Sequence, residues 1–401
     1  MSRRNRAQRQ NHVQLGFVSL ESRDVPASFY VDPSFTTAGS TVDFNVGLPN
    51  EAKGLTVGTN AFATIVDAVT KANAAAGLDD INLSAATHLV DPGFGAITLT
   101  ESANIIGSGE TFTTVEAIGN TVGLTSVDGA VFQFAPGTAV DVSNLTYDGR
   151  SGLGTKAGSV LRYDAATGLV SNVTIRNVGT TNGGINLGIG VNAVNVGANV
   201  DVVGGTFFGI GRTGVSFSDG AMGSVGSSNF TGLTTPGIVN YGIEAIESSS
   251  VTISGSTFAN YSGTSGTFDS AGVQIVDDVT FDLSGNGNNA DEPSTAKIVG
   301  NSFSNNATAI IVGSNATLDT STALIQFNNI FDNKFGVLAN IKTEVNALFN
   351  YWGSAAGPLA KATSLPRRTT RPGWLPARCR RSCFIAMRRT KPSAYSPGRR
   401  R

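Results

Sequence analysis

Hydrophobic residues recur along this chain with two different spacings. Near residue 60 the spacing is helical: Phe62, Ile65, Val66 and Val69 fall at positions i, i+3, i+4 and i+7, and a glycine follows shortly afterwards. This pattern gathers apolar side chains on one face, and glycine then ends the helix. We therefore predict one amphipathic helix of about four turns within residues 61–83.

From about residue 140 onward a longer repeat replaces the helical spacing. Seven segments, among them LVSNVTIRN and TISGSTFAN, align on a large apolar anchor near their end, with separations of 28, 32, 23, 28, 45 and 28 residues. The anchors are Tyr147, Ile175, Phe207, Phe230, Phe258, Phe303 and Phe331. A Val or Ile stands five residues before each anchor except the last, where Gln326 indicates a shift of one residue in register.

Two residues after each anchor the chain carries Gly or Asn. These positions are Gly149, Asn177, Gly209, Gly232, Asn260, Asn305 and Asn333. Gly and Asn enter the left-handed backbone conformation at low cost, so this position predicts the same sharp turn in every repeat.

A second apolar series has a similar step. It starts from Val215, Ile243, Val273, Ile310 and Val337, with separations of 28, 30, 37 and 27 residues. Around each of these residues the pattern alternates with period 2, as in a half-buried strand. A unit this short cannot bury its own apolar side, but stacked units bury a continuous core. The pattern predicts an all-β fold, a single right-handed parallel β-helix; propellers and leucine-rich repeats would show other signatures.

The chain also resembles the right-handed β-helix family with pectate-lyase-like repeats. FATIVDAVTKANAAAGLDDINLSAATH is similar to the capping helix and first strand of that family, ANIIGSG to its first-coil turn, and NYWGSAAGP to a segment near its last coils. The resemblance implies one β-helix over residues 60–358 with an N-terminal capping helix. Because the family contains pectate lyases, polygalacturonase-like hydrolases, tailspike proteins and surface adhesins, the fold alone does not choose a function.

The two ends of the chain differ from this body. Residues 1–27 are basic and end in LESRDVPA, which resembles the LExR…PA segment that begins many exported proteins of planctomycete bacteria. This implies a secreted or cell-surface bacterial protein, and we expect residues 28–59 to be a linker. Residues 359–401 are rich in Arg and Pro and hold both cysteines. We interpret them as a tail without regular structure, translated out of frame or left by a truncation; a basic tail for nucleic acid or an anionic envelope is the alternative.

Charge narrows the choice of partners. Residues 24–360 hold 28 acidic against 10 basic residues, a net charge of about −18, although the whole chain is at −1. An acidic body repels nucleic acid and attracts cations, so we expect no nucleic-acid partner for the β-helix. No apolar run reaches 18 residues, so the sequence predicts no membrane span.

Acidic residues supply the main candidate site. Asp219, Glu247 and Asp277 each stand four residues after a second-series anchor, Asp278 follows the last of them, and Glu244 points outward from its strand. Equivalent positions on neighbouring coils lie about 5 Å apart, so we expect the first three carboxylates to form a row. Oxygen ligands of this kind suit Ca²⁺, and the spacing also fits the carboxylate pair of a glycosidase. Solvated acids that keep the body soluble are the third interpretation.

A second calcium candidate lies inside the repeat of 45 residues. The segment DLSGNGNNADEPS carries Asp282, Asp291 and Glu292 without the spacing of an EF-hand, so an ordinary surface loop is the alternative. The chain has two histidines, His12 in the leader and His88 at the end of the first predicted strand, and we expect a structural role for His88.

The expected function is that of an exported or cell-surface β-helix protein with a non-catalytic binding or structural role. Its partner would be a polysaccharide, an extracellular matrix or surface protein, or Ca²⁺. The alternative is a carbohydrate-active enzyme, a polysaccharide lyase or glycoside hydrolase, although the DD and GHG signatures of the hydrolases are absent. An enzyme should show acidic and basic side chains converging in a groove, whereas a binding scaffold should show rows of Ser, Thr and Asn with scattered charge.

Overall fold

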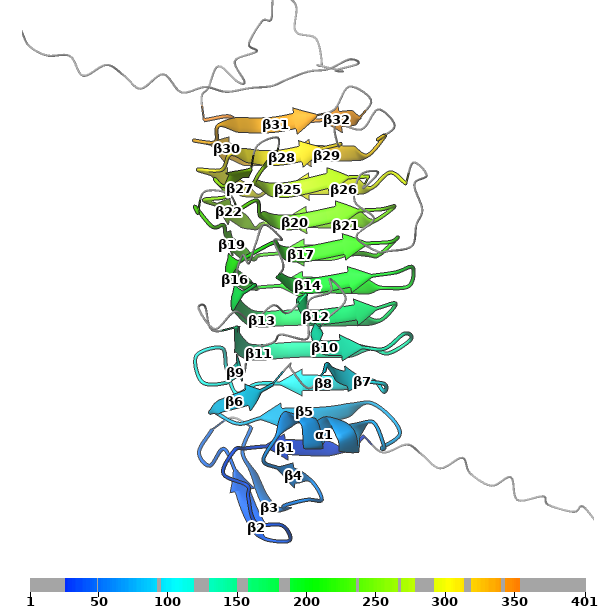
Figure 1. The fold of residues 1–401 in the computed structure, drawn as a ribbon, viewed down its shortest axis with the longest axis vertical. Coiled ribbons are helices and arrows are strands. Elements are labelled where there is room, and N and C mark those ends of the chain that lie inside the picture. The colour runs from blue at the N-terminus through cyan, green and yellow to red at the C-terminus, as the bar shows by residue number, and fades with distance from the viewer. Residues whose placement is uncertain are drawn as a thin grey trace, which may run out of the picture.

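The computed structural model describes residues 26–48, 50–91, 95–118, 130–149, 158–179, 188–235, 238–265, 268–277, 292–313, 319–339 and 343–353. These residues form a right-handed parallel β-helix, in which short strands stack coil upon coil along one long axis (Figure 1). The fold class predicted from the repeats is therefore confirmed. Within these ranges no helix is long and apolar enough to cross a membrane. Most of the basic leader and the whole basic tail lie outside the described residues.

Each coil of the central stack contributes three strands, which we group into rows A, B and C. Rows A and B belong to the larger sheet and row C forms a separate sheet. Row A contains β15 (Asn199–Val203), β18 (Met222–Gly226), β21 (Ser250–Ser254), β26 (Thr295–Val299), β29 (Thr322–Gln326) and β32 (Glu344–Asn346). Row B contains β16 (Thr206–Ile210), β19 (Asn229–Thr231), β22 (Thr257–Ala259), β27 (Ser302–Ser304) and β30 (Asn329–Phe331). Row C contains β7 (Ile97–Leu99), β10 (Ala130–Phe134), β12 (Ser159–Asp164), β14 (Ile189–Val194), β17 (Thr213–Ser218), β20 (Tyr241–Ile246), β25 (Ala271–Val276), β28 (Thr308–Val312) and β31 (Phe335–Ala339).

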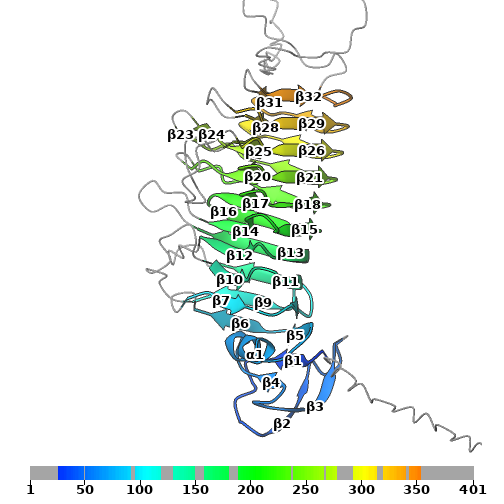
Figure 2. The ribbon, with the colours of Figure 1, turned by 90° about the vertical axis from the view of Figure 1, so that its right-hand side faces the viewer.

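Earlier coils continue the same rows. Two long strands span rows A and B, β11 (Val140–Asp148) and β13 (Thr167–Val178). Before them come β5 (Asp79–Leu83), β6 (Thr87–Val90), β8 (Ala103–Ile106) and β9 (Thr114–Ala117). A small antiparallel pair, β23 (Thr264–Ser265) and β24 (Phe268–Asp269), lies between β22 and β25 in the chain. In Figure 2 the row A strands from β15 to β32 form one column along the side of the stack.

The apolar anchors predicted from the repeats stack inside the β-helix. Phe207, Phe230, Phe258 and Phe303 are register partners in successive row B strands, and all four are buried. Their rings lie nearly parallel, with centroids 4.7, 4.9 and 4.8 Å apart. The second series is likewise in register from Val215 to Val337.

The last repeat departs from the predicted alignment by one residue. Phe303 pairs with Ile330, so Ile330 is the buried anchor and Phe331 points to the other side of the strand. The preceding strand shows the same shift, since Ile298 pairs with Ile325 rather than with Gln326. The shift follows from side-chain polarity, because a core position accepts isoleucine in place of glutamine.

The expected left-handed turn occurs at only some of the predicted positions. The backbone angle φ is positive at Asn177, Gly209, Asn260 and Asn305. In the last repeat it is positive at Asp332 instead of Asn333, again one residue earlier.

Gly149 and Gly232 are absent from the residues with positive φ, so the prediction is wrong there. Space explains both glycines. A Cβ atom on Gly149 would lie 2.2 Å from the carbonyl oxygen of Asn177, and one on Gly232 would lie 2.7 Å from the Cα of Tyr261.

Residues 28–59 belong to the fold and are not the linker that we expected. β1 (Ser28–Val31) pairs in parallel with β5, and β2 (Thr41–Phe44) forms an antiparallel hairpin with β3 (Ala52–Thr56). The hairpin closes a small second core, formed by Phe35, Phe44, Leu55, Val57 and Ala61. Four residues of SFYV are enough to add a strand below the first coil, a signal too short to recognise in a sequence.

The predicted helix is present but shorter than expected. α1 (Ile65–Ala72) begins at the N-cap Thr64, whose hydroxyl oxygen accepts a hydrogen bond from the backbone N of Asp67 at 3.1 Å. Val66, which we placed on the apolar face, is 53% exposed, while Phe62 lies in β4 (Ala61–Phe62). Two alanines complete the buried face, so the face is turned by about one position from the predicted one.

Candidate binding face

The three acids of the predicted row do occupy equivalent positions. Asp219, Glu247 and Asp277 each follow directly after a row C strand, and those strands are paired in matching register. Glu247 is only 4% exposed and Asp277 only 2%, so these two acids do not extend into solvent. The interpretation of the row as solvated acids is therefore wrong for them.

A fourth buried acid, Asp319, joins this edge. Its Oδ2 accepts a hydrogen bond from the backbone N of Asp277 at 3.0 Å, and its Oδ1 accepts one from the backbone N of Ser321 at 2.9 Å. The carboxylate of Asp319 therefore organises the turn between two coils.

Calcium binding stays a prediction. In the described part of the chain, no group of three or more His, Cys, Asp and Glu side chains is placed to hold a metal ion. Asp278, Asp282 and Asp291 lie outside the described residues, and Glu292 lies within them. The backbone oxygen of Glu292 accepts a hydrogen bond from the N of Ser248 at 2.8 Å.

Glu244 belongs to a buried ion pair on the outer side of row C. Its Oε1 lies 2.7 Å from Nη2 of Arg212, and its Oε2 accepts hydrogen bonds from Nε of Arg212 at 3.2 Å and from the hydroxyl of Thr213. The guanidinium carbon of Arg212 stands 5.3 Å from the ring centre of Tyr241. Glu244 is 2% exposed, and both of its oxygens are held by the protein. This two-pronged geometry fixes the side chain firmly and points to a structural role.

A second acid and arginine pair lies on the outer side of β11 and β13. Nε of Arg176 donates to Oδ2 of Asp148 at 2.8 Å, and Nδ2 of Asn177 donates to Oδ1 at 2.9 Å. Glu116 is the register partner of Asp148 in the previous coil. Here too both carboxylate oxygens of the aspartate accept hydrogen bonds from the chain itself.

The outer side of rows A and B carries a different kind of surface, which we call the hydroxyl face. It consists of Ser224, Asn229, Ser250, Thr252, Thr257, Thr295, Ser302 and Asn329, all exposed or half-buried. Register pairs align these side chains from coil to coil, for example Ser224 with Thr252 and Asn229 with Thr257. The strands of rows A and B from β15 to β30 contain only two charged residues, Asp201 and Lys297.

Hydrogen bonds along the hydroxyl face run between coils. The Thr257 hydroxyl donates to Oδ1 of Asn229 at 2.8 Å, and the Thr295 hydroxyl donates to the Ser250 hydroxyl at 3.1 Å. Each bond holds a side chain in place and leaves further donor and acceptor capacity on side chains that are exposed. The face is therefore a nearly uncharged array of hydroxyl and amide groups, interrupted by the exposed apolar side chains of Val203 and Met222.

His88 is buried near the N-terminal end, as a structural residue would be. It is 2% exposed, and its Nε2 lies 3.2 Å from the backbone oxygen of Ser84. Burial lowers the pKa of His88, and the contact with Ser84 and the charge of Asp32 oppose this only in part. A ligand at the surface cannot reach this ring.

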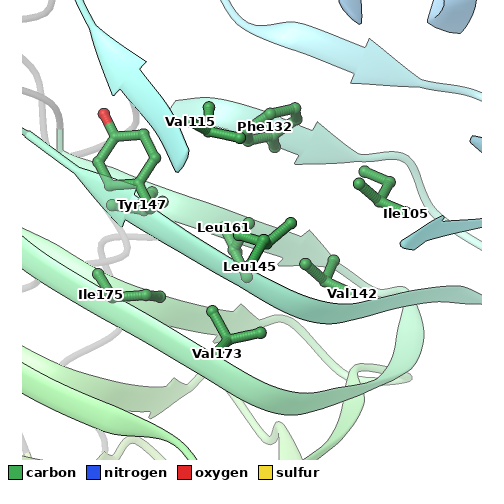
Figure 3. Close-up of a pocket in the computed structure, with 10 residues that line it drawn as sticks. Ile105, Val115, Phe132, Val142, Leu145, Tyr147, Leu161, Val173 and Ile175 are labelled. Carbon is green, nitrogen blue, oxygen red and sulfur yellow. The ribbon is translucent and has the colours of Figure 1, made fainter. Parts of the chain in front are cut away.

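An apolar cavity lies inside the first coils (Figure 3). Its volume of about 10 Å³ is no more than a single water molecule requires. Its lining is Ile105, Val115, Phe132, Val142, Leu145, Tyr147, Val160, Leu161, Val173 and Ile175. A water there would need polar partners, which this lining does not offer, so we regard the cavity as a packing defect.

Comparisons with known proteins find similar structures and no relative by sequence. No family model matches the chain, and no curated protein matches it. Among solved structures, the chain is similar to ORF18 of Geobacillus virus E2, with 12% identity, a TM-score of 0.37, and coverage of 73% of this chain and 55% of the other.

Two further structures are similar to a comparable degree. A mutant of the periplasmic alginate epimerase AlgG shows 11% identity, a TM-score of 0.31, and coverage of 68% and 55%. The surface adhesin PfbA of Streptococcus pneumoniae shows 13% identity, a TM-score of 0.34, and coverage of 72% and 87%. The chain spans about half the length of ORF18 and of AlgG. At such TM-scores we draw no functional conclusion from these similarities.

Some features of these surfaces escaped the sequence analysis. The pairing of Asp148 with Arg176 was detectable, because the two residues are 28 positions apart, the step of the repeat. The burial of Glu244 was not detectable, because it depends on what packs against the outer side of row C.

Proposed function

We propose that this protein is a non-catalytic binding protein outside the cytoplasm, and that its hydroxyl face holds a linear, uncharged polysaccharide. The observation that carries the proposal is the alignment of exposed Ser, Thr and Asn side chains across successive coils. Such rows with scattered charge are what a binding scaffold should show.

The repeat of the face suits a polymer. Parallel strands repeat about every 4.8 Å along the axis, so a glycan lying along the axis meets an equivalent donor and acceptor in each coil. A single hydroxyl contact in water contributes little, but linked contacts on one chain reinforce each other. Because Asp201 and Lys297 nearly cancel, the face favours a neutral glycan over an acidic one.

The acid and arginine pairs support a non-catalytic role over the enzymatic alternative. A general acid or base must come within hydrogen-bond reach of the reacting group. Glu244 is buried, and both oxygens of Glu244 and of Asp148 accept hydrogen bonds from their own chain. A position outside the cytoplasm is supported by the resemblance of the N-terminal segment to those of exported proteins.

Retention of the full chain on insoluble polysaccharides tests the proposal. Cellulose, xylan, mannan and starch would represent neutral glycans, and pectate and alginate acidic ones, each with and without Ca²⁺. We expect calcium-independent retention on at least one neutral glycan. Thr252→Lys, in the middle of the hydroxyl face, should reduce this retention about tenfold, a loss of about 1.4 kcal/mol.

Thr41→Lys is the matched control, because Thr41 is exposed in β2, away from the face. It should leave retention unchanged. Release of reducing or unsaturated sugars by the parent protein would overturn the non-catalytic assignment. Absence of retention on every neutral glycan, or equal retention of Thr252→Lys and the parent, would overturn the binding proposal.

A further inference from the structure

A column of left-handed turns runs between rows A and B. Its members occupy the same place in successive coils, and each has a positive φ: Asn144, Asn172, Gly204, Ser227, Gly255, Gly300, Phe327 and Phe349. The first six are residues that tolerate this conformation or are small. The last two are phenylalanines, with φ of 57° and 61°.

The two phenylalanine rings are exposed and lie over each other. Phe327 is 62% exposed and Phe349 70%, with ring centres 5.6 Å apart and planes 9° apart. The preceding turn carries Gly300, which has no side chain that could cover Phe327. The space beside Gly300 is open, since an added Cβ there would meet nothing within 4 Å. Tyr351, two residues after Phe349, is 52% exposed.

Folding alone does not explain aromatic residues at these positions. The left-handed conformation is unfavourable for a bulky residue, and Asn or Gly adopts it at lower cost. Burial of the two rings offsets little of this cost, since most of their surface stays in water. Strain of this kind at an exposed position points to a function.

We infer that Phe327 and Phe349 form a stacking platform for a sugar ring of the glycan that the hydroxyl face holds. The inference rests on the proposed function and adds an apolar subsite to it. The platform lies in the turn between rows A and B, and therefore between the two halves of the hydroxyl face. The electron-rich face of an aromatic ring attracts the polarised C–H groups of a sugar. The hydroxyl groups of the sugar can then reach neighbouring amides. Gln326 and Asn329 supply such amides beside Phe327.

The surroundings fit a sugar better than a protein or a lipid. A stable protein interface buries about 800 Å² on each partner, far more than a few rings provide. Residues 322–331 and 343–353 contain no Lys or Arg, which an anionic lipid headgroup would require. An uncharged ligand with both apolar and hydroxyl surfaces matches what is present.

The substitutions Phe327→Asn and Phe349→Asn, alone and together, test the platform. Asn already occupies this turn at Asn144 and Asn172, so the double variant should unfold at the same or a higher denaturant concentration than the parent. Its retention on the neutral glycan that the parent binds, out of cellulose, xylan, mannan and starch, should fall about tenfold. Ser227→Asn, at the same turn three coils earlier, is the matched control and should retain the parent's affinity.

The outcomes separate this inference from the function on which it rests. If the double variant binds like the parent while Thr252→Lys does not, the platform is wrong and the hydroxyl face stands. If the parent binds no neutral glycan, both fall. A lower unfolding midpoint in the double variant would assign the rings to folding instead. If the parent self-associates and the double variant does not, the two rings form a contact between copies of the chain. Either a lower unfolding midpoint or this loss of self-association would overturn the inference.

Discussion

The side-chain oxygen of Asn328 accepts two hydrogen bonds from Asn301, one from the backbone N at 2.8 Å and one from Nδ2 at 3.0 Å. Asn350 repeats the arrangement one coil further on, accepting from the N and the Nδ2 of Asn328, both at 2.9 Å. Nδ2 of Asn328 also donates to the carbonyl oxygen of Ile298 at 2.9 Å. This ladder pairs the polar groups of the turn between rows A and B without any need for water.

Asn328→Ala should therefore destabilise the β-helix strongly. Asn328 is 1% exposed, and its removal leaves the backbone N and Nδ2 of Asn301 and the oxygen of Ile298 without these partners. Because each buried unsatisfied group costs about 1–3 kcal/mol, we expect a loss of about 3 kcal/mol or more in the free energy of unfolding. Unfolding in guanidinium chloride, followed by circular dichroism, measures it. Asn329→Ala, on the exposed neighbour, should change stability by less than about 0.5 kcal/mol, and equal losses in both variants would contradict a special role of the ladder.

The stacked phenylalanines make a second prediction about the core. Phe230 lies between Phe207 and Phe258, with ring centres 4.7 and 4.9 Å away. Phe230→Ala removes a ring that has neighbours on both faces, and should lower the free energy of unfolding by about 3–5 kcal/mol. Phe230→Leu keeps much of the volume and should cost about 1–2 kcal/mol. Calorimetric melting of the two variants and the parent compares them; a leucine variant as unstable as the alanine variant would mean that ring geometry, rather than volume, dominates.

Glu244→Gln should destabilise the fold even though it changes few atoms. The substitution leaves Arg212 facing a neutral amide inside a region where Glu244 is 2% exposed. Removing one partner of a fully buried pair costs about 3–5 kcal/mol, but the Arg212 side chain is 28% exposed, so we expect about 2 kcal/mol. Urea unfolding gives the value. Lys53→Met is the control, because it breaks an ion pair of the same 2.7 Å length whose lysine is 68% exposed. It should cost much less than Glu244→Gln, because the exposed pair is screened by water, and a Glu244→Gln loss no larger than that of Lys53→Met would show that burial adds nothing.

The sequence predicted the fold because each coil repeats the same apolar anchor, although the number of residues between anchors varies. Phe207, Phe230 and Phe258 are 23 and 28 residues apart, and they still occupy one column because each stands at the same place in its strand. The prediction failed where this anchor pattern is weak. The shift to Ile330 follows from one polar residue, and the strand β1 from a segment of four residues.

The candidate site was less predictable, for two physical reasons. Register follows from the repeat, so the alignment of Asp219, Glu247 and Asp277 was foreseeable. Burial instead depends on what packs against the outer surface, so the 2% exposure of Asp277 was not. The left-handed phenylalanines escaped notice because the repeat marks Gly or Asn turns, and Phe327 takes the same backbone conformation without that signature.

Acid should weaken the N-terminal end through His88. Burial lowers the pKa of His88 in the folded protein below the ordinary histidine value of about 6.5. The unfolded chain therefore binds a proton before the folded one does, so stability is complete above about pH 6.5 and is lost as the pH falls through that value towards the lowered pKa.

The negative charge of Asp32 raises the pKa of His88 and so limits the loss of stability in acid. Burial raises the pKa of Asp32, but hydrogen bonds from Ser34 and Ser84 and the charge of His88 outweigh it, so the net shift is downward. Its carboxylate therefore stays ionised near His88 over the range in which the histidine titrates, and its contribution to stability is lost only at a lower pH, as the pH falls through its lowered pKa.

Unfolding free energies measured at intervals between pH 8 and pH 5 test the role of His88. The parent should lose stability across this interval, and His88→Gln, which cannot take up the proton, should show a flatter profile. His12→Gln removes the chain's other histidine and should keep the slope of the parent. If His88→Gln keeps that slope while His12→Gln flattens it, the buried ring is not the group that responds to acid, and the lowered pKa of His88 has no bearing on stability in this range.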